Sequence, residues 1–224
     1  MYRACIFDLD GTLANTLASI ACFANAALRE CGYGTIETDA YRNLVGNGAD
    51  VLMHGMLDTV LGKGNYAETD IARLRKTYDR LYESDPMHLV KNYPGMPEML
   101  ARLKQTGMKT GVLSNKPDNC ACAVAETLFP TGTFDCCHGQ RAGVPRKPSP
   151  EGALLLAREL RTDPRDILYI GDTNVDMQTG RSAGMHTAGV LWGFRGRAEL
   201  QAAHPDYIVE TPEELYGIAV GIGR

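Results

Sequence analysis

The stretch CIFDLDGTL, residues 5–13, determines the expected fold and the expected chemistry of this chain. A buried strand is predicted from Tyr2 to Leu9, because the run is apolar and of strand length and its polarity is delayed until Asp8. Asp8 and Asp10 are two residues apart, and an extended backbone turns both carboxylates to the same side. Gly11 permits a sharp turn, and Thr12 offers a hydroxyl and an amide in the loop that follows. Two carboxylates at the end of a buried strand indicate a Mg²⁺ site, with a solvated acidic turn as the alternative.

The composition is that of a globular protein with a sizeable core. Of 224 residues, 44% are hydrophobic and 22% charged, and the formal net charge of −4 gives no basic surface for nucleic acid or an anionic membrane. No signal-peptide pattern and no apolar run of membrane length is present, so we expect a cytoplasmic protein. The seven cysteines form no C-x-x-C pair. Buried free thiols in a reducing compartment are expected, ahead of a zinc site at Cys136, Cys137 and His138.

The chain is expected to contain a helical insert within an alternating strand–helix domain. Apolar residues recur at helical spacing in three segments with no strand pattern between them, namely residues 17–31, 49–61 and 68–84. We therefore expect an all-helical cap domain over residues 15–93. The remaining residues, 1–14 and 94–224, form the core domain.

Within the core domain, short apolar strands alternate with helices. This alternation predicts an α/β fold, a doubly wound parallel sheet of Rossmann-like type with helices on both faces. Ser149 is expected to cap a helix whose first residue is Pro150. Ligands of such sheets bind beyond the carboxyl ends of the strands, which is where polar side chains should be sought.

Polar side chains follow three separate predicted strands. Each has an ordinary explanation when taken alone: a turn starter, a solvated loop cation, or a loop acid. Their arrangement at equivalent strand ends predicts a common site instead. The candidates are Asp8 and Asp10 after the first strand, Ser114 and Asn115 after the second, Asp172 and Asp176 after a later one, and Lys147 in a proline-rich loop.

These residues carry a resemblance to a known family. The chain resembles the haloacid dehalogenase superfamily, in the phosphatase branch that has a helical cap inserted after the first strand. The four motifs that carry it stand in order: D8-L-D10-G-T, S114-N, K147-P and G171-D172-x-x-x-D176. The stretch from Val45 to Leu52 and the phrases S114-N-K-P and G189-V-L-W-G-F look most like those of phosphoglycolate phosphatases.

The resemblance implies a reaction and a role for each motif residue. Asp8 would attack phosphorus and form an aspartyl phosphate. Asp10 would protonate the leaving oxygen and then accept a proton from the hydrolytic water. Lys147 would neutralise Asp8 and the phosphate, and Ser114 would donate a hydrogen bond to a phosphoryl oxygen. The implied function is hydrolysis of a small phosphomonoester, similar to phosphoglycolate.

The resemblance also implies a cofactor and further substrate contacts. Mg²⁺ would be held by Asp8, by the main-chain carbonyl of Asp10 and by Asp172, while Asp176 would hold the waters of the ion. Thr12 and Asn115 would join Ser114 in binding the substrate.

From the cap, Asn47 is expected to contact the substrate, because Gly46 and Gly48 let the backbone approach a ligand closely. The alternative for this stretch is an ordinary turn between helices, with Asn47 as a helix cap.

Other functions remain open at this point. A sugar-phosphate mutase would pass the phosphoryl group to a second hydroxyl, and a pyrophosphatase or a nucleotidase would use the same fold. The alternative of a different class is a non-catalytic protein that binds phosphorylated metabolites. The expected partner in every case is a small phosphorylated metabolite, and the sequence indicates no oligomeric state.

Overall fold

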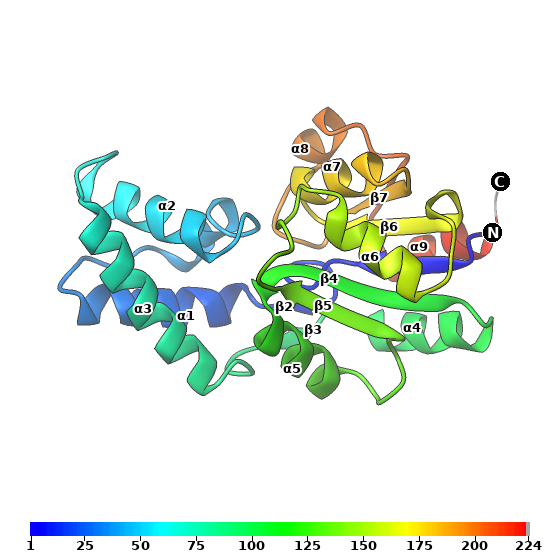
Figure 1. The fold of residues 1–224 in the computed structure, drawn as a ribbon, viewed down its shortest axis with the longest axis horizontal. Coiled ribbons are helices and arrows are strands. Elements are labelled where there is room, and N and C mark those ends of the chain that lie inside the picture. The colour runs from blue at the N-terminus through cyan, green and yellow to red at the C-terminus, as the bar shows by residue number, and fades with distance from the viewer. Residues whose placement is uncertain (223–224) are drawn as a thin grey trace. The chain divides into compact units, whose positions relative to one another are not determined.

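The computed structural model describes residues 1–222, which form two compact units (Figure 1). One unit contains residues 1–15 together with the chain from Lys91 onward, and the other contains residues 16–90. Among the described residues, no helix has both the length and the apolar character that crossing a membrane requires. All seven cysteines are free thiols.

The first unit is built on a six-stranded sheet in the order β5-β4-β1-β6-β7-β8, with every neighbouring pair parallel. The strands are β1 (Ala4–Phe7), β4 (Lys109–Pro117), β5 (Cys136–Gln140), β6 (Ile167–Gly171), β7 (His186–Val190) and β8 (Tyr207–Val209). The central strands β1 and β6 are fully buried, because helices cover both of their faces. A separate two-stranded antiparallel sheet pairs β2 (Ala14–Asn15) with β3 (Lys91–Asn92).

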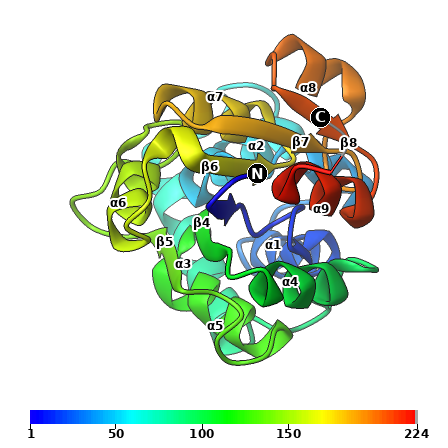
Figure 2. The same cartoon turned by 90° about the vertical axis from the view of Figure 1, so that its right-hand side faces the viewer.

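Helices cover both faces of the large sheet (Figure 2). On one face lie α6 (Glu151–Glu159) and α7 (Asn174–Ser182), and on the other lie α4 (Met96–Gln105), α5 (Asp118–Leu128) and α9 (Pro212–Val220). The short helix α8 (Arg197–Ala202) packs beside α7, and a 3-10 turn (Pro164–Asp166) precedes β6. The predicted doubly wound α/β fold is thus confirmed.

The second unit is helical, with no strand among its residues. It contains α1 (Leu17–Glu30), a 3-10 helix (Thr38–Asn43), α2 (Ala49–Leu61) and α3 (Glu68–Ser84). Its core includes apolar residues whose spacing predicted the helices, such as Leu28, Leu52 and Leu74, all buried, whereas Val51 and Leu61 of the predicted apolar set in α2 are exposed. The sequence pattern did not predict the 3-10 helix, since six residues are too few for a periodic signal.

The helix start predicted at Ser149 was wrong. The residue before the first helical position of α6 is Pro150, and no side-chain hydrogen bond caps the helix there. Instead, the Ser149 N–H donates to the Arg146 carbonyl at 3.0 Å, in the turn that carries Lys147. This serine therefore belongs to the loop that positions the lysine.

Strand register brings the candidate residues to one edge of the sheet. Phe7 lies opposite Val112 on one side and Ile170 on the other. Asp8 and Asp172, which follow β1 and β6, and Ser114, which lies inside β4 near its carboxyl end, are therefore at the same edge of the sheet.

Candidate active site

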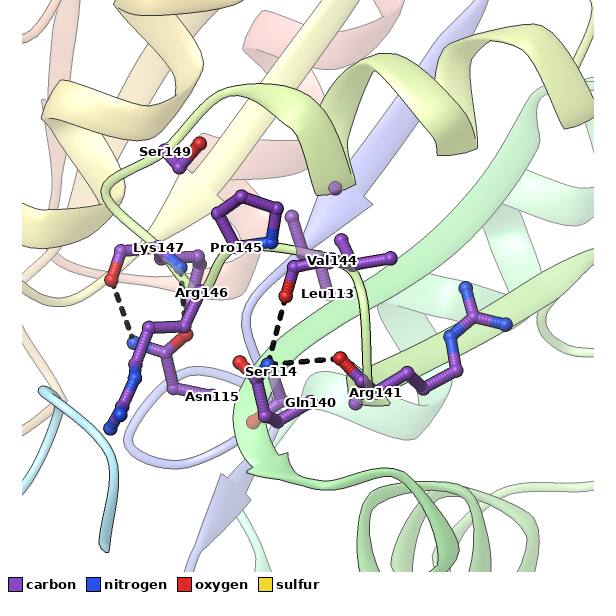
Figure 3. A pocket seen from close by; sticks show the side chains of 12 residues that line it. Leu113, Ser114, Asn115, Gln140, Arg141, Val144, Pro145, Arg146, Lys147 and Ser149 are labelled. Atoms are coloured by element: carbon purple, nitrogen blue, oxygen red, sulfur yellow. Dashed lines mark hydrogen bonds between the residues drawn. The ribbon is translucent and has the colours of Figure 1, made fainter. Parts of the chain in front are cut away.

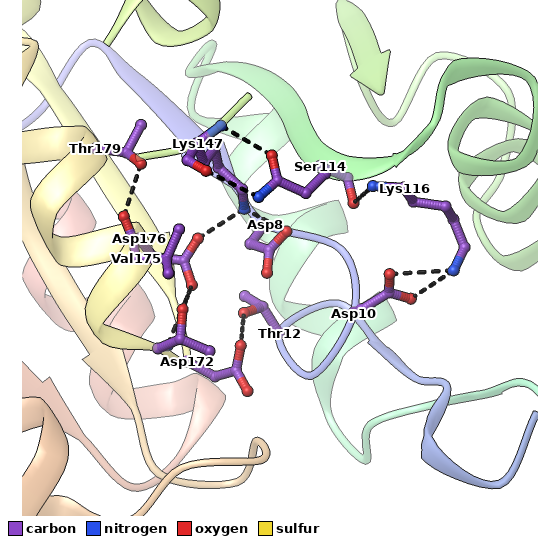
Figure 4. A network of polar contacts seen from close by, with 12 residues as sticks. Asp8, Asp10, Thr12, Ser114, Lys116, Lys147, Asp172, Val175, Asp176 and Thr179 are labelled. Carbon is purple, nitrogen blue, oxygen red and sulfur yellow. Dashed lines mark hydrogen bonds and ion pairs between the residues drawn. The ribbon is translucent and has the colours of Figure 1, made fainter. Parts of the chain in front are cut away.

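The site begins with Asp8, directly after β1. Its N–H donates to the Ile170 carbonyl at 2.8 Å, which extends the ladder to β6 by one residue and fixes the start of the loop. The Leu9 carbonyl then accepts from Leu13 and Ala14, so the chain turns at once. The side chain of Asp8 is only 9% exposed, and its carboxylate lies at the centre of the polar network in Figure 4.

Lys147 joins two carboxylates from different strands. Its ammonium lies 2.7 Å from Asp8 Oδ1 and 2.7 Å from Asp176 Oδ1, and its side chain is 4% exposed. Burial, reinforced by Asp176, raises the pKa of the Asp8 carboxyl to about 7, although Lys147 acts in the opposite direction. Burial alone lowers the pKa of the Lys147 ammonium, but Asp176 and Asp8 raise it well above its usual value. The lysine is therefore a fixed positive charge.

Asn115 fixes the main chain of Lys147. The Asn115 amide donates to the Lys147 carbonyl at 3.1 Å and accepts from the Lys147 N–H at 2.8 Å (Figure 3). This reciprocal pair ties the end of β4 to the lysine loop. Ser114, from the same strand end, is buried, and its hydroxyl oxygen accepts from the Lys116 N–H at 3.2 Å. Asn115 therefore positions the main chain of Lys147. Substrate binding by Asn115 and Ser114 stays a prediction.

Asp172 follows β6 and is fully buried. Its Oδ2 accepts the Phe194 N–H at 2.7 Å, and its Oδ1 lies 3.5 Å from the Thr12 hydroxyl, which donates to it. Burial, followed by the charges of Asp176 and Asp8, raises the pKa of Asp172 well above its usual value. Thr12 thus contacts an acid of the site, and its predicted contact with substrate is untested.

Asp176, on the first turn of α7, is also fully buried. Its Oδ2 accepts from the Thr173 N–H at 3.1 Å and from the Thr173 hydroxyl at 2.7 Å. Its Oδ1 already contacts Lys147. Both oxygens therefore have protein partners, as expected for a carboxylate that organises a site from outside the ligand set of a metal.

The donor set fits a small divalent cation. Asp8, Asp172 and Asp176 each offer one oxygen, and these oxygens lie within 4.8 Å of one another. Three carboxylates facing one ammonium leave two negative charges in a buried space, which is unfavourable without a further cation. Hard carboxylate oxygens suit Mg²⁺ or Ca²⁺ better than softer metals. The residues at the end of β1 and β6 are therefore those that could hold a divalent ion.

Asp10 points away from Asp8 and contacts Lys116, a residue to which the sequence reasoning gave no role (Figure 4). The Lys116 ammonium lies 3.0 and 3.1 Å from the two oxygens of Asp10. The available signal was a lysine directly after the Ser114–Asn115 pair, at the end of a strand that leads into the site.

The loop after β7 also contributes contacts that the sequence reasoning missed. Phe194 donates its amide to Asp172, and the Trp192 indole N–H donates to the Thr12 carbonyl at 3.0 Å. In the sequence this loop stands out only through the phrase G189-V-L-W-G-F. Asn47 belongs to the second unit, where the residue before α2 is Gly48, with no side-chain cap. Its contact with a substrate stays a prediction.

Gly193 is expected to be essential for the position of Asp172. An added Cβ would lie 2.3 Å from Asp172 Cβ and 2.6 Å from the Gly11 carbonyl oxygen, far inside contact distance. Gly193→Ala should therefore lower the free energy of unfolding, measured by urea denaturation, by about 1–3 kcal/mol. Gly196→Ala is the matched control in the same loop, because nothing lies within 4 Å of its Cβ. Equal stability of the two variants would contradict this packing.

Comparisons with known proteins show which proteins this chain is similar to. A family model described as haloacid dehalogenase-like hydrolase matches residues 5–190. The chain is 32% identical to a phosphoglycolate phosphatase of Aquifex aeolicus over 95% of this chain and 94% of that protein. It is 29% identical to a phosphoglycolate phosphatase of Mannheimia succiniciproducens, over 95% and 96%. The crystal structure of a candidate phosphoglycolate phosphatase from Lactobacillus delbrueckii subsp. bulgaricus matches with a TM-score of 0.89 and 28% identity, over 97% of this chain and 98% of that one.

Proposed function

Because the chain belongs to the haloacid dehalogenase-like hydrolase family, we propose that it is a Mg²⁺-dependent phosphatase that cleaves a small phosphomonoester. The family and the hydrolase class predicted from the four motifs are thereby confirmed, whereas the metal, the intermediate and the substrate are our proposal. The observation that carries it is that Asp8, Asp172 and Asp176 lie together, buried, at one edge of the sheet. Lys147 forms ion pairs there with Asp8 and Asp176.

Asp8 is the proposed nucleophile. It lies at the end of the central strand β1, and its Oδ1 is held by Lys147 at 2.7 Å. The proposed first step forms a bond between an Asp8 oxygen and phosphorus and breaks the bond from phosphorus to the leaving alcohol oxygen. Water then attacks the aspartyl phosphate, releases inorganic phosphate and regenerates the Asp8 carboxylate. Lys147, a fixed positive charge, offsets charge on the transferred group, and Ser114 donates a hydrogen bond to it.

Mg²⁺ would be held by the carboxylates of Asp8 and Asp172 and by the main-chain carbonyl of Asp10. When bound, it neutralises charge on the phosphoryl oxygens. Asp176 keeps Lys147 and the Thr173 turn in place, while Phe194 and Thr12 orient Asp172. These contacts hold the acids of the site in position without a ligand.

Asp10 is the proposed acid and base. It gives a proton to the leaving alcohol oxygen in the first step and takes one from the attacking water in the second. Its carboxylate must reach the leaving oxygen, and in this structure it is held by Lys116. Exchange of this ion pair for the leaving group is therefore part of the proposed cycle.

Phosphoglycolate, or a phosphomonoester of similar size, is the proposed substrate. Support comes from the relatives named phosphoglycolate phosphatase, which match nearly the full length of this chain. In this proposal the helical residues 15–93 act as a cap, and Asn47 contacts the distal part of the substrate. The core residues Thr12 and Asn115 complete the phosphate-binding loops.

The test of this function is the release of inorganic phosphate from phosphoglycolate by purified protein with Mg²⁺ and with EDTA. We expect turnover that requires the metal and exceeds turnover of larger esters such as nucleoside monophosphates. Binding of phosphoglycolate without phosphate release would favour a non-catalytic binding protein. Transfer of the phosphoryl group to a second sugar hydroxyl would favour a mutase.

Asp10→Asn separates proton transfer from metal binding. The variant keeps the main-chain carbonyl proposed to bind Mg²⁺ and loses only the acid. We expect phosphoglycolate turnover to fall about 10²- to 10⁴-fold, the usual contribution of general acid–base catalysis. Mg²⁺ affinity, measured by calorimetry, should change less than about threefold. A large loss of metal affinity would mean that the Asp10 side chain is itself a ligand.

A further inference from the structure

Lys116 is a buried cation of the site that the proposed reaction uses only as the partner that Asp10 leaves. Its side chain is 4% exposed, and its ammonium contacts both oxygens of Asp10 at 3.0 and 3.1 Å. In Figure 4 the two side chains point toward each other on the right of the network, beside Asp8. The proposed reaction assigns Lys147 to Asp8 and the phosphoryl group, so Lys116 is a second positive charge with a separate task.

The position of Lys116 is fixed by the sheet. It lies near the end of β4, and its N–H donates to the Ser114 hydroxyl oxygen. A Cβ added to Gly139 would lie 2.6 Å from the Lys116 carbonyl oxygen, so the neighbouring strand β5 packs directly against this backbone. The main chain of the lysine is thus held by the strand that carries it. A buried ammonium requires an anionic partner, which is Asp10 in this structure.

Because Lys116 contacts Asp10, the proposed role of Asp10 indicates where Lys116 lies relative to the substrate. In the proposed function Asp10 contacts the leaving alcohol oxygen, and Lys116 lies one hydrogen bond beyond Asp10. The ammonium and that oxygen are therefore the two partners that the one Asp10 side chain reaches by turning. A carboxylate one carbon away from the ester oxygen extends across the gap between them. When Asp10 turns toward the leaving oxygen, such a carboxylate can take its place on Lys116.

We propose that Lys116 is a specificity-determining residue that binds an anionic group on the leaving alcohol. The inference rests on the proposed function and deepens it by naming the substrate class: phosphomonoesters with a carboxylate close to the ester oxygen. The exchange of one carboxylate for another on Lys116 releases Asp10 for proton transfer only when the right alcohol is present. Selection and proton transfer are thereby coupled through one ammonium group.

The test compares two esters that differ in this group alone. Phosphoglycolate carries the carboxylate, whereas 2-hydroxyethyl phosphate has the same carbon frame with a hydroxyl. The measured quantity is the ratio of kcat/KM for phosphoglycolate to kcat/KM for 2-hydroxyethyl phosphate. Any effect that Lys116 exerts on both esters through Asp10 cancels in this ratio.

Lys116→Met should lower the ratio about 10- to 100-fold, as expected for loss of a charge-assisted hydrogen bond. Lys104→Met is the matched control: this lysine pairs with Asp135 at the opposite edge of the sheet, and the ratio should not change. Lys116→Arg keeps the positive charge and should retain most of the preference. If the methionine variant does not fold, Lys116→Gln, which keeps a hydrogen-bond donor near Asp10, serves in its place with the same expected loss.

Two contrary results have distinct meanings. A ratio that stays within about threefold of wild type in the Lys116 variants, or a wild type with no preference, overturns this inference alone. Such a result would show that the lysine only orients Asp10. A wild type that hydrolyses neither ester with Mg²⁺ overturns the proposed function itself.

Discussion

Asp8→Asn is expected to lower the rate of phosphoglycolate hydrolysis roughly 10⁴-fold or more, the scale of loss when a nucleophile is removed. The amide is nearly the same size as the carboxylate but cannot attack phosphorus. The variant should fold, because Asp8 carries one of three like charges in a buried cluster, and removing it relieves repulsion. The measurement is phosphate release at saturating Mg²⁺, combined with a thermal unfolding curve of each protein.

The matched control for this change is Asp163→Asn. Asp163 lies outside the site, in the turn before β6, where it pairs with Arg165 on the surface. Its replacement should leave turnover unchanged. If pure Asp8→Asn protein kept even a tenth of wild-type turnover, Asp8 would not be the nucleophile.

Asp172→Asn is expected to remove most of the stabilising effect of Mg²⁺. In the metal-free protein the pKa of Asp8 is raised from 3.8 to about 7. The pKa of Asp172 is raised well above its usual value, first by burial and then by the charges of Asp176 and Asp8. A carboxyl group with a raised folded-state pKa stabilises the fold below its unfolded pKa and loses that contribution as pH rises through the folded pKa. Metal-free wild type should therefore lose stability between about pH 4 and pH 7, and for Asp8 alone the loss is on the order of 4 kcal/mol.

Mg²⁺ should restore this stability at pH 8 in the wild type, since it binds the folded acids only. In Asp172→Asn one charge of the cluster is gone. The variant should be more stable than wild type without metal at pH 8 and should gain little from added Mg²⁺. The measurement is urea denaturation at pH 5 and pH 8, with Mg²⁺ or EDTA, and with Asp163→Asn as the surface control. An unchanged response of Asp172→Asn to Mg²⁺ would show that Asp172 is not a ligand.

The sequence predicted the fold because its signals are local. The helices at 17–30, 49–61 and 68–84 follow from the spacing of apolar residues, and β6, β7 and β8 follow from short apolar runs. The end of β4 was not predicted, because the strand continues through Ser114 and Asn115 to Pro117, although these residues were expected to follow it. The start of α6 was misplaced because Ser149 and Pro150 make a good cap pattern, yet the turn around Lys147 uses the serine backbone instead. The local cap pattern was therefore not used, because the turn that positions Lys147 requires the Ser149 backbone.

The site was predictable as a set of residues but not as a set of contacts. Asp8, Asp172, Asp176 and Lys147 come together as the motifs indicated. The pairing of Asp10 with Lys116, however, depends on a sheet register that joins residues about a hundred positions apart. No spacing rule reveals such a partner.

The same limit applies to the second sphere of contacts around the site. The Asn115 amide holds the main chain of Lys147, and the Phe194 amide holds Asp172. Each joins loops that follow different strands. The sequence shows that these residues are polar or lie in a loop. Their hydrogen-bond partners are seen only in the folded chain.

The central claim is that Asp8 becomes phosphorylated during turnover. The most direct measurement is a rapid acid quench of protein with phosphoglycolate and Mg²⁺, followed by borohydride reduction, which converts an aspartyl phosphate to homoserine, and by peptide mass spectrometry. The account predicts homoserine at position 8, dependent on both substrate and Mg²⁺ and absent from Asp8→Asn. Homoserine at another aspartate, or turnover with unmodified Asp8 throughout, would contradict it.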